Sequence, residues 1–230
     1  MLETCVFGAG SIGCYVGGRL AAAGASVMFV GRQRMAEELR THGLHLTDYR
    51  GADERVPPAS VRFETAPARP LRADLVLVTV KSGGTEEVAR TLSEVLAPEA
   101  VVISFQNGID NAGVLRRLLP AHTVLAGMVP FNTLNAGQGH FHQGTEGDLE
   151  VEDHPALARF ESDFARAGLP LKRQADMRAV LWAKLLLNLN NPVNALSGVP
   201  LKEELSQRAY RQCLALAQLE GLRILEAAGI

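Results

Sequence analysis

The sequence predicts an α/β protein in which a doubly wound, mainly parallel sheet is followed by an incomplete all-helical C-terminal domain. A glycine-rich turn follows the first apolar run, and apolar runs then alternate with helical patterns as far as Val129. From Asp176 onward the pattern is helical. Because alternating strands and helices produce a parallel sheet with helices on both faces, we place the sheet domain at residues 1–174 and the first part of the helical domain at 175–230.

The glycine-rich turn lies between two expected elements. Leu2–Phe7 has the composition of a buried strand, and Ser11–Ala23 that of a helix that ends at Gly24. A second strand is expected over Ser26–Val30. The turn between the first strand and the helix has GxGxxG spacing and comprises Gly8, Ala9, Gly10, Ser11, Ile12 and Gly13.

Each glycine of this turn has its own physical role. Gly8 permits the tight turn, Gly10 lets the main chain approach a pyrophosphate, and Gly13 lets the helix lie close to the first strand. Free N–H groups at the helix N-terminus face the anion. The context therefore predicts a Rossmann-type dinucleotide site, although in a chain with 22 glycines the same spacing can also serve only a tight connection.

The end of the second strand indicates which nucleotide binds. NAD sites usually place an acidic residue there to bind the ribose 2′-OH, but this chain has Gly31-Arg32-Gln33-Arg34. Gly31 leaves room for a 2′-phosphate, and the guanidinium of Arg32 matches phosphate oxygens, with Arg34 as a second cation. We therefore predict NADPH; the alternative is that both arginines are ordinary solvated loop charges.

The remaining elements of the sheet domain follow the same alternation. Residues 40–73 break this pattern and predict a surface hairpin and loops, and residues 139–151 predict another hairpin. The further expected strands are Asp74–Val80, Val101–Phe105 and Thr123–Val129, and the further expected helices are Thr85–Leu96 and Asn111–Leu119.

Composition excludes several classes of protein. With 47% hydrophobic and 21% charged residues, the 230-residue chain has ordinary globular values. A net charge of −2 and the lack of a basic block argue against a nucleic-acid partner. No apolar run reaches the ~18 residues that a membrane span needs, and the first strand begins too early for a signal peptide. A cytoplasmic location follows as the expectation.

Cysteine and histidine usage does not predict a metal site. Cys5, Cys14 and Cys213 are too scattered for a disulfide framework or a zinc site, and we interpret them as reduced packing residues. His140 and His142 alternate on an expected strand and so share one face, but no further pair of ligands lies nearby.

Polar residues follow two of the expected strands. Lys81 comes after the strand that ends at Val80, and Asn107-Gly108 follows the strand that ends at Phe105. Ligands of doubly wound sheets lie beyond these carboxyl ends. We expect Lys81 to contact the ribose or nicotinamide side of the cofactor and Asn107 to contact the nicotinamide or the substrate. The alternative is that both residues only end their strands and form turns, as Lys and Asn-Gly commonly do.

The helical segment after Asp176 contains a polar stripe among leucines. Lys184, Asn188 and Asn191 recur at i, i+4 and i+7, so one helix would align them. A partly buried lysine has a lowered pKa and can act as a proton donor. The alternative is a lysine whose stem lies over leucines, with asparagines that cap the helix before Pro192.

The order of these motifs resembles the ketopantoate reductase (2-dehydropantoate 2-reductase) family over nearly the whole chain. The resemblance rests on the glycine turn, Arg32, Val78-Thr-Val-Lys81, Gln106-Asn-Gly108 and the segment from Leu181 to Asn188. It implies that Lys184 is the catalytic acid and also contacts substrate, with Asn188 as a substrate partner. By the same resemblance, Asn107 is shared by substrate and cofactor, and Arg32, Lys81 and the main chain of Asn132 contact NADPH.

The reaction that the resemblance implies is hydride transfer from NADPH to the ketone carbon of a 2-oxo acid, with proton donation from Lys184. For ketopantoate the product would be pantoate, for pantothenate and coenzyme A synthesis. The family's Asn-x-x-x-Asn-Pro segment is one residue shorter here, as Asn188-Leu-Asn-Asn191-Pro192. Either Asn191, which Pro192 favours, or Asn194 takes the second substrate-amide role.

The last helix of the chain raises a question of assembly. The family continues for several helices past the position of Ile230, so the expected helix from Arg208 to Glu226 has few partners for its leucines. We expect either a longer polypeptide or a homodimer through the helical domain. The face in question comprises Leu214, Leu216, Leu219, Leu222 and Leu225.

Three functional classes follow from the sequence. The first is an NADPH-dependent reductase of ketopantoate or of another 2-oxo acid. The second is a truncated, non-catalytic NADPH-binding or redox-sensing protein. The third is an interaction module that uses the leucine-rich last helix.

Overall fold

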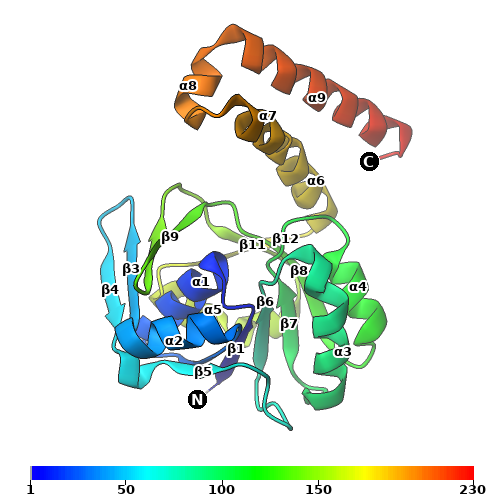
Figure 1. The fold of residues 1–230 in the computed structure, drawn as a ribbon. Coiled ribbons are helices and arrows are strands. Elements are labelled where there is room, and N and C mark those ends of the chain that lie inside the picture. Colours follow the sequence, from blue (N-terminus) through cyan, green and yellow to red (C-terminus); the bar gives the residue numbers. More distant parts are fainter. Residues whose placement is uncertain (1) are drawn as a thin grey trace. The chain divides into compact units, whose positions relative to one another are not determined.

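The computed structural model describes residues 2–230, which form two compact units. The first unit ends at Met177 and the second comprises Arg178–Ile230. Figure 1 labels the elements of both, and the first unit contains all of the strands that the structure describes.

The first unit is built on an eight-stranded sheet in the order β12-β11-β8-β7-β6-β1-β2-β5. All neighbouring strands in it are parallel except β11 and β8, which are antiparallel. The predicted doubly wound, mainly parallel sheet is therefore confirmed. Its strands are β1 (Glu3–Phe7), β2 (Ser26–Val30), β5 (Arg62–Glu64), β6 (Leu75–Val78), β7 (Val101–Ser104), β8 (Thr123–Met128), β11 (Leu149–Glu152) and β12 (Leu171–Gln174).

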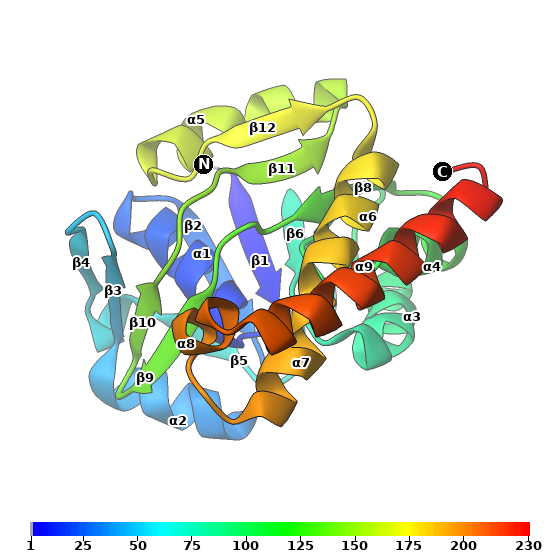
Figure 2. The same cartoon turned by 90° about the horizontal axis from the view of Figure 1, so that it is seen from above.

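Alternate residues of the central strands supply two separate cores. On β1, Val6 packs in the core shared with α1 (Ser11–Ala22), and Cys5 packs in the core shared with α3 (Thr85–Val95) and α4 (Asn111–Leu118). Figures 1 and 2 show α3 and α4 together on one face of the sheet, with α1 on the other. Period-two alternation therefore explains why these strands are almost continuously apolar.

A second, four-stranded sheet covers α1 and has the order β4-β3-β10-β9. The predicted hairpin within residues 40–73 is β3–β4, but the prediction of a hairpin over residues 139–151 is wrong. β10 pairs with β9 and with β3, whereas β11 joins the large sheet beside β8. The strands are β3 (Leu44–Asp48), β4 (Asp53–Val56), β9 (Thr133–Gly137) and β10 (His140–Gln143).

Several further elements of the first unit were not predicted, β9 and β12 among them. Helix α2 (Gln33–His42) follows β2, and of its residues only Ala36 and Leu39 are buried. β5 is a three-residue edge strand that pairs with β2. The unit also contains α5 (Glu161–Arg166) and short 3₁₀ turns at Pro58–Ser60, Ser82–Gly84 and Pro155–Arg159. The predicted strands and helices from β1 to β8 otherwise agree with the structure to within two residues at each end.

The second unit is helical, as predicted. It comprises most of α6 (Met177–Asn188), together with α7 (Asn190–Ser197), α8 (Leu201–Ser206) and α9 (Arg208–Ala227). α9 packs against α6, because a Cβ at Gly221 would meet Leu186 at 2.7 Å (Figure 2). Along α9, Leu225 is buried, contrary to expectation, whereas Leu216, Leu219 and Leu222 are exposed.

Candidate functional site

The candidate cofactor site lies at the carboxyl edge of the parallel strands in the first unit. β1 lies between β6 and β2, so the strand order reverses there. This is the position at which doubly wound sheets bind their ligands. The turn after β1 and the loops after β2, β6 and β7 all leave from this edge.

The three glycines of the turn meet different surroundings. Gly8 has a φ of +117°, and a Cβ there would lie 2.6 Å from the main-chain nitrogen of Val80. A Cβ at Gly13 would lie 2.3 Å from the carbonyl oxygen of Gly8, whereas a Cβ at Gly10 would meet nothing within 4 Å. Gly8 and Gly13 are thus required by the protein's own packing, while the space beside Gly10 is open to a ligand.

Helix α1 begins directly behind this opening. Gly10 is its N-cap and provides no side-chain cap, and no acidic residue lies in its first turn. Since the first N–H groups of a helix have no intrahelical acceptor, those of Ser11, Ile12 and Gly13 are oriented to receive an anion. These residues fit the pyrophosphate of a dinucleotide.

Thr79 was not singled out by the sequence, yet it holds the turn in place. Its hydroxyl donates to the carbonyl oxygen of Gly8 at 2.7 Å, and a Cβ at Gly13 would meet the same hydroxyl at 2.6 Å. The available signal was a polar residue next to a buried apolar strand, which is too common to be specific.

Gly31 has a packing role that the sequence did not indicate. A Cβ at Gly31 would lie 2.8 Å from the Cβ of Ala9 and 3.0 Å from the ring of Phe63. The main-chain N–H groups of Gly8 and Ala9 both donate to the carbonyl of Val30. The glycine therefore allows the turn to lie on the end of β2, and the space at its Cβ position is filled by the protein itself.

Arg32 follows Gly31 and caps the N-terminus of α2 with its main chain. Its side chain is exposed, as is that of Arg34. No acidic residue lies in the first turn of α2. The site edge therefore carries a guanidinium at the position where NAD-specific sites carry a carboxylate.

Lys81 and Asn107 lie in the loops after the neighbouring strands β6 and β7. Both side chains are exposed. The main-chain carbonyl of Asn107 is held by the hydroxyl of Ser82 and the amide of Asn111, each at 2.8 Å. The structure thus brings these two predicted residues to the same edge as the glycine turn.

Asn132 lies after β8, and its main chain is already engaged. Its N–H donates to Thr145 Oγ1 at 2.9 Å, and its carbonyl accepts from the N–H of Gly144 at 2.9 Å. A main-chain contact with a cofactor would therefore have to use the second lone pair of the carbonyl. The exposed side-chain amide is the other group that this residue offers.

In the second unit, Lys184 and Asn188 share helix α6, but Asn191 does not. α6 ends at Asn188 and α7 begins at Asn190, so the predicted i, i+4, i+7 stripe on one helix is wrong at its third member. Lys184 is partly buried, and desolvation lowers its pKa. Asn194 donates its amide to the carbonyl of Val199 at 3.1 Å, whereas Asn191 is exposed.

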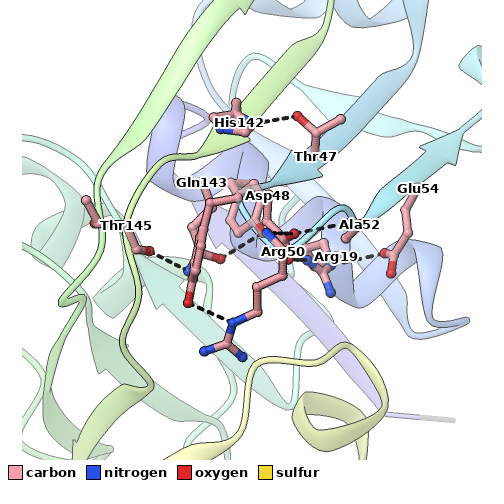
Figure 3. A network of polar contacts seen from close by, with 11 residues as sticks. Arg19, Thr47, Asp48, Arg50, Ala52, Glu54, His142, Gln143 and Thr145 are labelled. Carbon is pink, nitrogen blue, oxygen red and sulfur yellow. Dashed lines mark hydrogen bonds and ion pairs between the residues drawn. The ribbon is translucent and has the colours of Figure 1, made fainter.

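A second polar cluster of the first unit is structural. Arg19, which is 6% exposed, lies 3.1 Å from Glu54 of β4, and this ion pair fastens α1 to the small sheet (Figure 3). Arg19 also donates to the hydroxyl of Tyr15 on the same helix at 2.9 Å. Although desolvation raises the pKa of Asp48, hydrogen bonds from the backbones of Ala52 and Arg50 hold it below its ordinary value.

The predicted shared face of His140 and His142 is confirmed, because both rings contact Thr47 Oγ1 at 2.8 Å. Within residues 2–230, no group of three or more His, Cys, Asp or Glu side chains is placed to hold a metal ion. Cys5 and Cys14 are buried, and burial raises the pKa of Cys5 to about 12; Cys213 is exposed. None of the helices described is both long enough and apolar enough to cross a membrane.

Comparison with known proteins gives one consistent family. The family model described as ketopantoate reductase PanE/ApbA matches residues 4–156. The 2-dehydropantoate 2-reductase of Halobacterium salinarum is 30% identical over 236 residues, covering 100% of this chain and 77% of the relative. That of Archaeoglobus fulgidus is 31% identical over 200 residues, covering 84% of this chain and 64% of the relative.

Solved structures are similar in the same way. A PanE/ApbA family ketopantoate reductase from Ralstonia eutropha JMP134 matches with a TM-score of 0.88 and 33% identity, covering 100% of this chain and 76% of that one. D-mandelate dehydrogenase with NADH and anilino(oxo)acetate matches with a TM-score of 0.86 at 16% identity, covering 100% of this chain and 75% of that one. The second likeness shows a shared fold.

Proposed function

Because the chain belongs to the ketopantoate reductase family, a family of oxidoreductases, we propose that it reduces ketopantoate to pantoate with NADPH. The observation that carries the proposal is the alignment of the whole chain, at 30% identity, with a curated relative named 2-dehydropantoate 2-reductase. When bound, NADPH supplies the hydride that the 2-oxo carbon receives.

The cofactor is assigned to the carboxyl edge of the first unit. The N–H groups of Ser11, Ile12 and Gly13 bind its pyrophosphate beside the open space at Gly10. Arg32 binds the 2′-phosphate through charge-assisted hydrogen bonds. Lys81, Asn107 and Asn132 contact the cofactor from the ends of the next strands.

Lys184 is assigned as the proton donor. Its Nζ holds a proton for the carbonyl oxygen of the substrate, which becomes the hydroxyl of the product. Desolvation lowers the pKa of this lysine, which brings the ammonium closer to the range in which it acts as an acid. The same charge stabilises the negative charge that develops on that oxygen.

Two asparagines are assigned to the substrate beside Lys184. Asn188 lies one helical turn after it on α6. Asn191 takes the second amide role, because the amide of Asn194 already donates to Val199. Asn107 is shared between substrate and cofactor.

The test is oxidation of NADPH against a panel of 2-oxo acids that includes ketopantoate and an aryl 2-oxo acid, with NADH as the cofactor control. The proposal expects the highest kcat/KM with ketopantoate and NADPH. A higher value for another 2-oxo acid would move the assignment to that substrate, since apolar pockets discriminate by only about 1–3 kcal/mol per methylene. Binding of NADPH without turnover of any member would favour the non-catalytic alternative.

A homodimer through the second unit belongs to the same proposal. Leu216, Leu219 and Leu222 lie exposed along α9, and a second copy can bury them. Sedimentation equilibrium of the purified chain tests this, and a monomer at all concentrations would refute it.

A further inference from the structure

Buried polar side chains lie beneath the loops that bear Lys81 and Asn107. Gln106 is 5% exposed, Thr85 2% and Asn111 8%. They adjoin a core that is otherwise apolar. Because a buried polar group is costly unless it is hydrogen-bonded, their contacts show what they hold together.

Gln106 uses its whole carboxamide. Its Nε2 donates to the carbonyl of Val80 at 3.1 Å and to Thr85 Oγ1 at 2.7 Å. Its Oε1 accepts from the hydroxyl of Ser104 at 2.9 Å. One side chain therefore joins the end of β7, the residue before Lys81 and the start of α3.

The connection continues through Thr85 to the next loop. Thr85 Oγ1 lies 2.9 Å from Asn111 Oδ1, and Asn111 Nδ2 donates to the carbonyl of Asn107 at 2.8 Å. The hydroxyl of Ser82 donates to the same carbonyl at 2.8 Å. The main chain of Asn107 is therefore held by two donors.

These bonds lie on both sides of Lys81. Val80, before it, is tied to Gln106, and Ser82, after it, is tied to Asn107. Gly108 has a φ of +110°, and a Cβ there would lie 3.1 Å from Asn111 Nδ2, so glycine leaves space for that amide. The loops that bear the exposed side chains of Lys81 and Asn107 are thus joined to each other by hydrogen bonds.

We propose that Gln106 is a positioning residue that, through Thr85 and Asn111, fixes the spacing between Lys81 and Asn107. The inference rests on the proposed function, in which both of these side chains contact NADPH. Gln106 itself touches neither cofactor nor substrate. A buried network that is fully hydrogen-bonded is suited to this role because it gives a loop one defined arrangement.

Gln174 provides a control within the same unit. Its side chain is half-buried, and its amide donates to the carboxylate of Glu150 on β11. It ends β12, which runs parallel to β11 and therefore opposite to β8, so it lies at the other edge of the sheet from the candidate site. Removing either glutamine costs hydrogen bonds, but of the two only Gln106 is tied to the loops that bear Lys81 and Asn107.

The experiment compares Gln106→Met with Gln174→Met in the full chain. NADPH affinity is measured by fluorescence titration, together with kcat and KM, at a temperature where both variants are fully folded. Since small misplacements of binding groups have large effects, Gln106→Met is expected to weaken NADPH binding about tenfold, and Gln174→Met less than about twofold. Equal effects of the two substitutions would overturn the inference.

A double-mutant cycle separates positioning from simple loss of stability. Asn107→Ala is expected to weaken NADPH binding less in the Gln106→Met background than in the unaltered protein, because the contact is already misplaced there. Additive effects would show that the two residues act independently, against the inference.

If Gln106→Met does not fold, Thr85→Val and Thr85→Ser carry the test. Serine keeps the hydroxyl that bridges Gln106 and Asn111, so it is expected to retain the affinity that valine loses; equal affinities would overturn the inference. An unaltered protein that does not bind NADPH would instead refute the proposed function. Normal binding with Gln106→Met equal to its control would refute the positioning role alone.

Discussion

The two units hold their candidate functional residues in different ways. In the first, the glycine turn and the loops after β6 and β7 are held by hydrogen bonds from buried or partly buried side chains, including Thr79, Gln106 and Asn111. In the second, Lys184 and Asn188 lie on a helix, and the buried residues described between Arg178 and Ile230 are Glu204 and Leu225. The proposed cofactor surface is thus held in place by hydrogen bonds within the first unit, whereas the proposed proton donor lies on a unit with few buried residues.

This contrast predicts that substitutions in the two units affect different quantities. Changes at the carboxyl edge of the first unit should alter nucleotide affinity, and changes on α6 should alter turnover. Each of the following experiments can break or sharpen that division.

The largest effect is expected for Lys184→Ala. Loss of the proton donor should lower kcat by about 10²- to 10⁴-fold, the range for general acid catalysis, while NADPH affinity changes little. Steady-state kinetics and a fluorescence titration measure the two quantities. Lys202→Ala, an exposed lysine of the same unit, is the control and should leave both unchanged. Full turnover in Lys184→Ala would remove the division between the units.

Arg32→Ala should weaken NADPH by about 10- to 100-fold, the value of a charge-assisted hydrogen bond, and leave NADH almost unchanged. The matched control is Arg40→Ala, at the other end of α2 and also exposed. Competition titrations with both nucleotides measure the preference. An equal loss for NADH and NADPH would mean that Arg32 does not recognise the 2′-phosphate.

Gly8→Ala should mainly lower stability, whereas Gly10→Ala should mainly weaken NADPH binding. The first places a Cβ at a φ of +117° and 2.6 Å from a main-chain nitrogen, so the free energy of unfolding should fall by at least about 1–3 kcal/mol. The second meets open space and should cost less than about 1 kcal/mol while weakening NADPH about tenfold. Thermal unfolding and titration test both; normal NADPH binding by Gly10→Ala would place the pyrophosphate elsewhere.

The smallest effect is a shift of the pH profile. Desolvation lowers the pKa of Lys184, so the ammonium form is present below that lowered pKa and is lost as the pH rises through it. The kcat should therefore decline at a lower pH than an ordinary lysine would give. Lys184→Arg, which stays protonated, should abolish this alkaline limb, and an unchanged limb would assign it to another group.

The sequence predicted the parts of the fold that have local signals. β2 and the turn at Gly8 were predicted correctly because an apolar run favours a buried strand and glycines with this spacing favour a tight turn before a helix. Helix α2 was missed because only Ala36 and Leu39 of it are buried, so its apolar periodicity is faint. β11 was misassigned because its pairing with β8 is a nonlocal contact.

The candidate site divides in the same manner. Lys81, Arg32 and Asn107 were predicted at this edge because each follows an apolar strand, and the structure has them in the loops beyond β6, β2 and β7. Thr85 and Asn111 were not, since hydroxyls and amides near helix starts are common and their mutual contacts depend on the packing of α3 against α4. Asn191 was placed on the wrong helix because the break at Leu189 has a helical φ of −60° and leaves no glycine or proline at that position.

The hydroxyl of Thr79 joins the glycine turn to a segment that lies far away in the sequence. Residues 8–13 take their shape partly from residue 79, which lies on the far side of the β3–β4 hairpin in the chain. In a protein split at the exposed tip of that hairpin, near Gly51, the turn and Thr79 would lie on different fragments. If the turn binds dinucleotide as proposed, neither half alone should bind it, and recovery of binding on mixing would report reassembly of the halves.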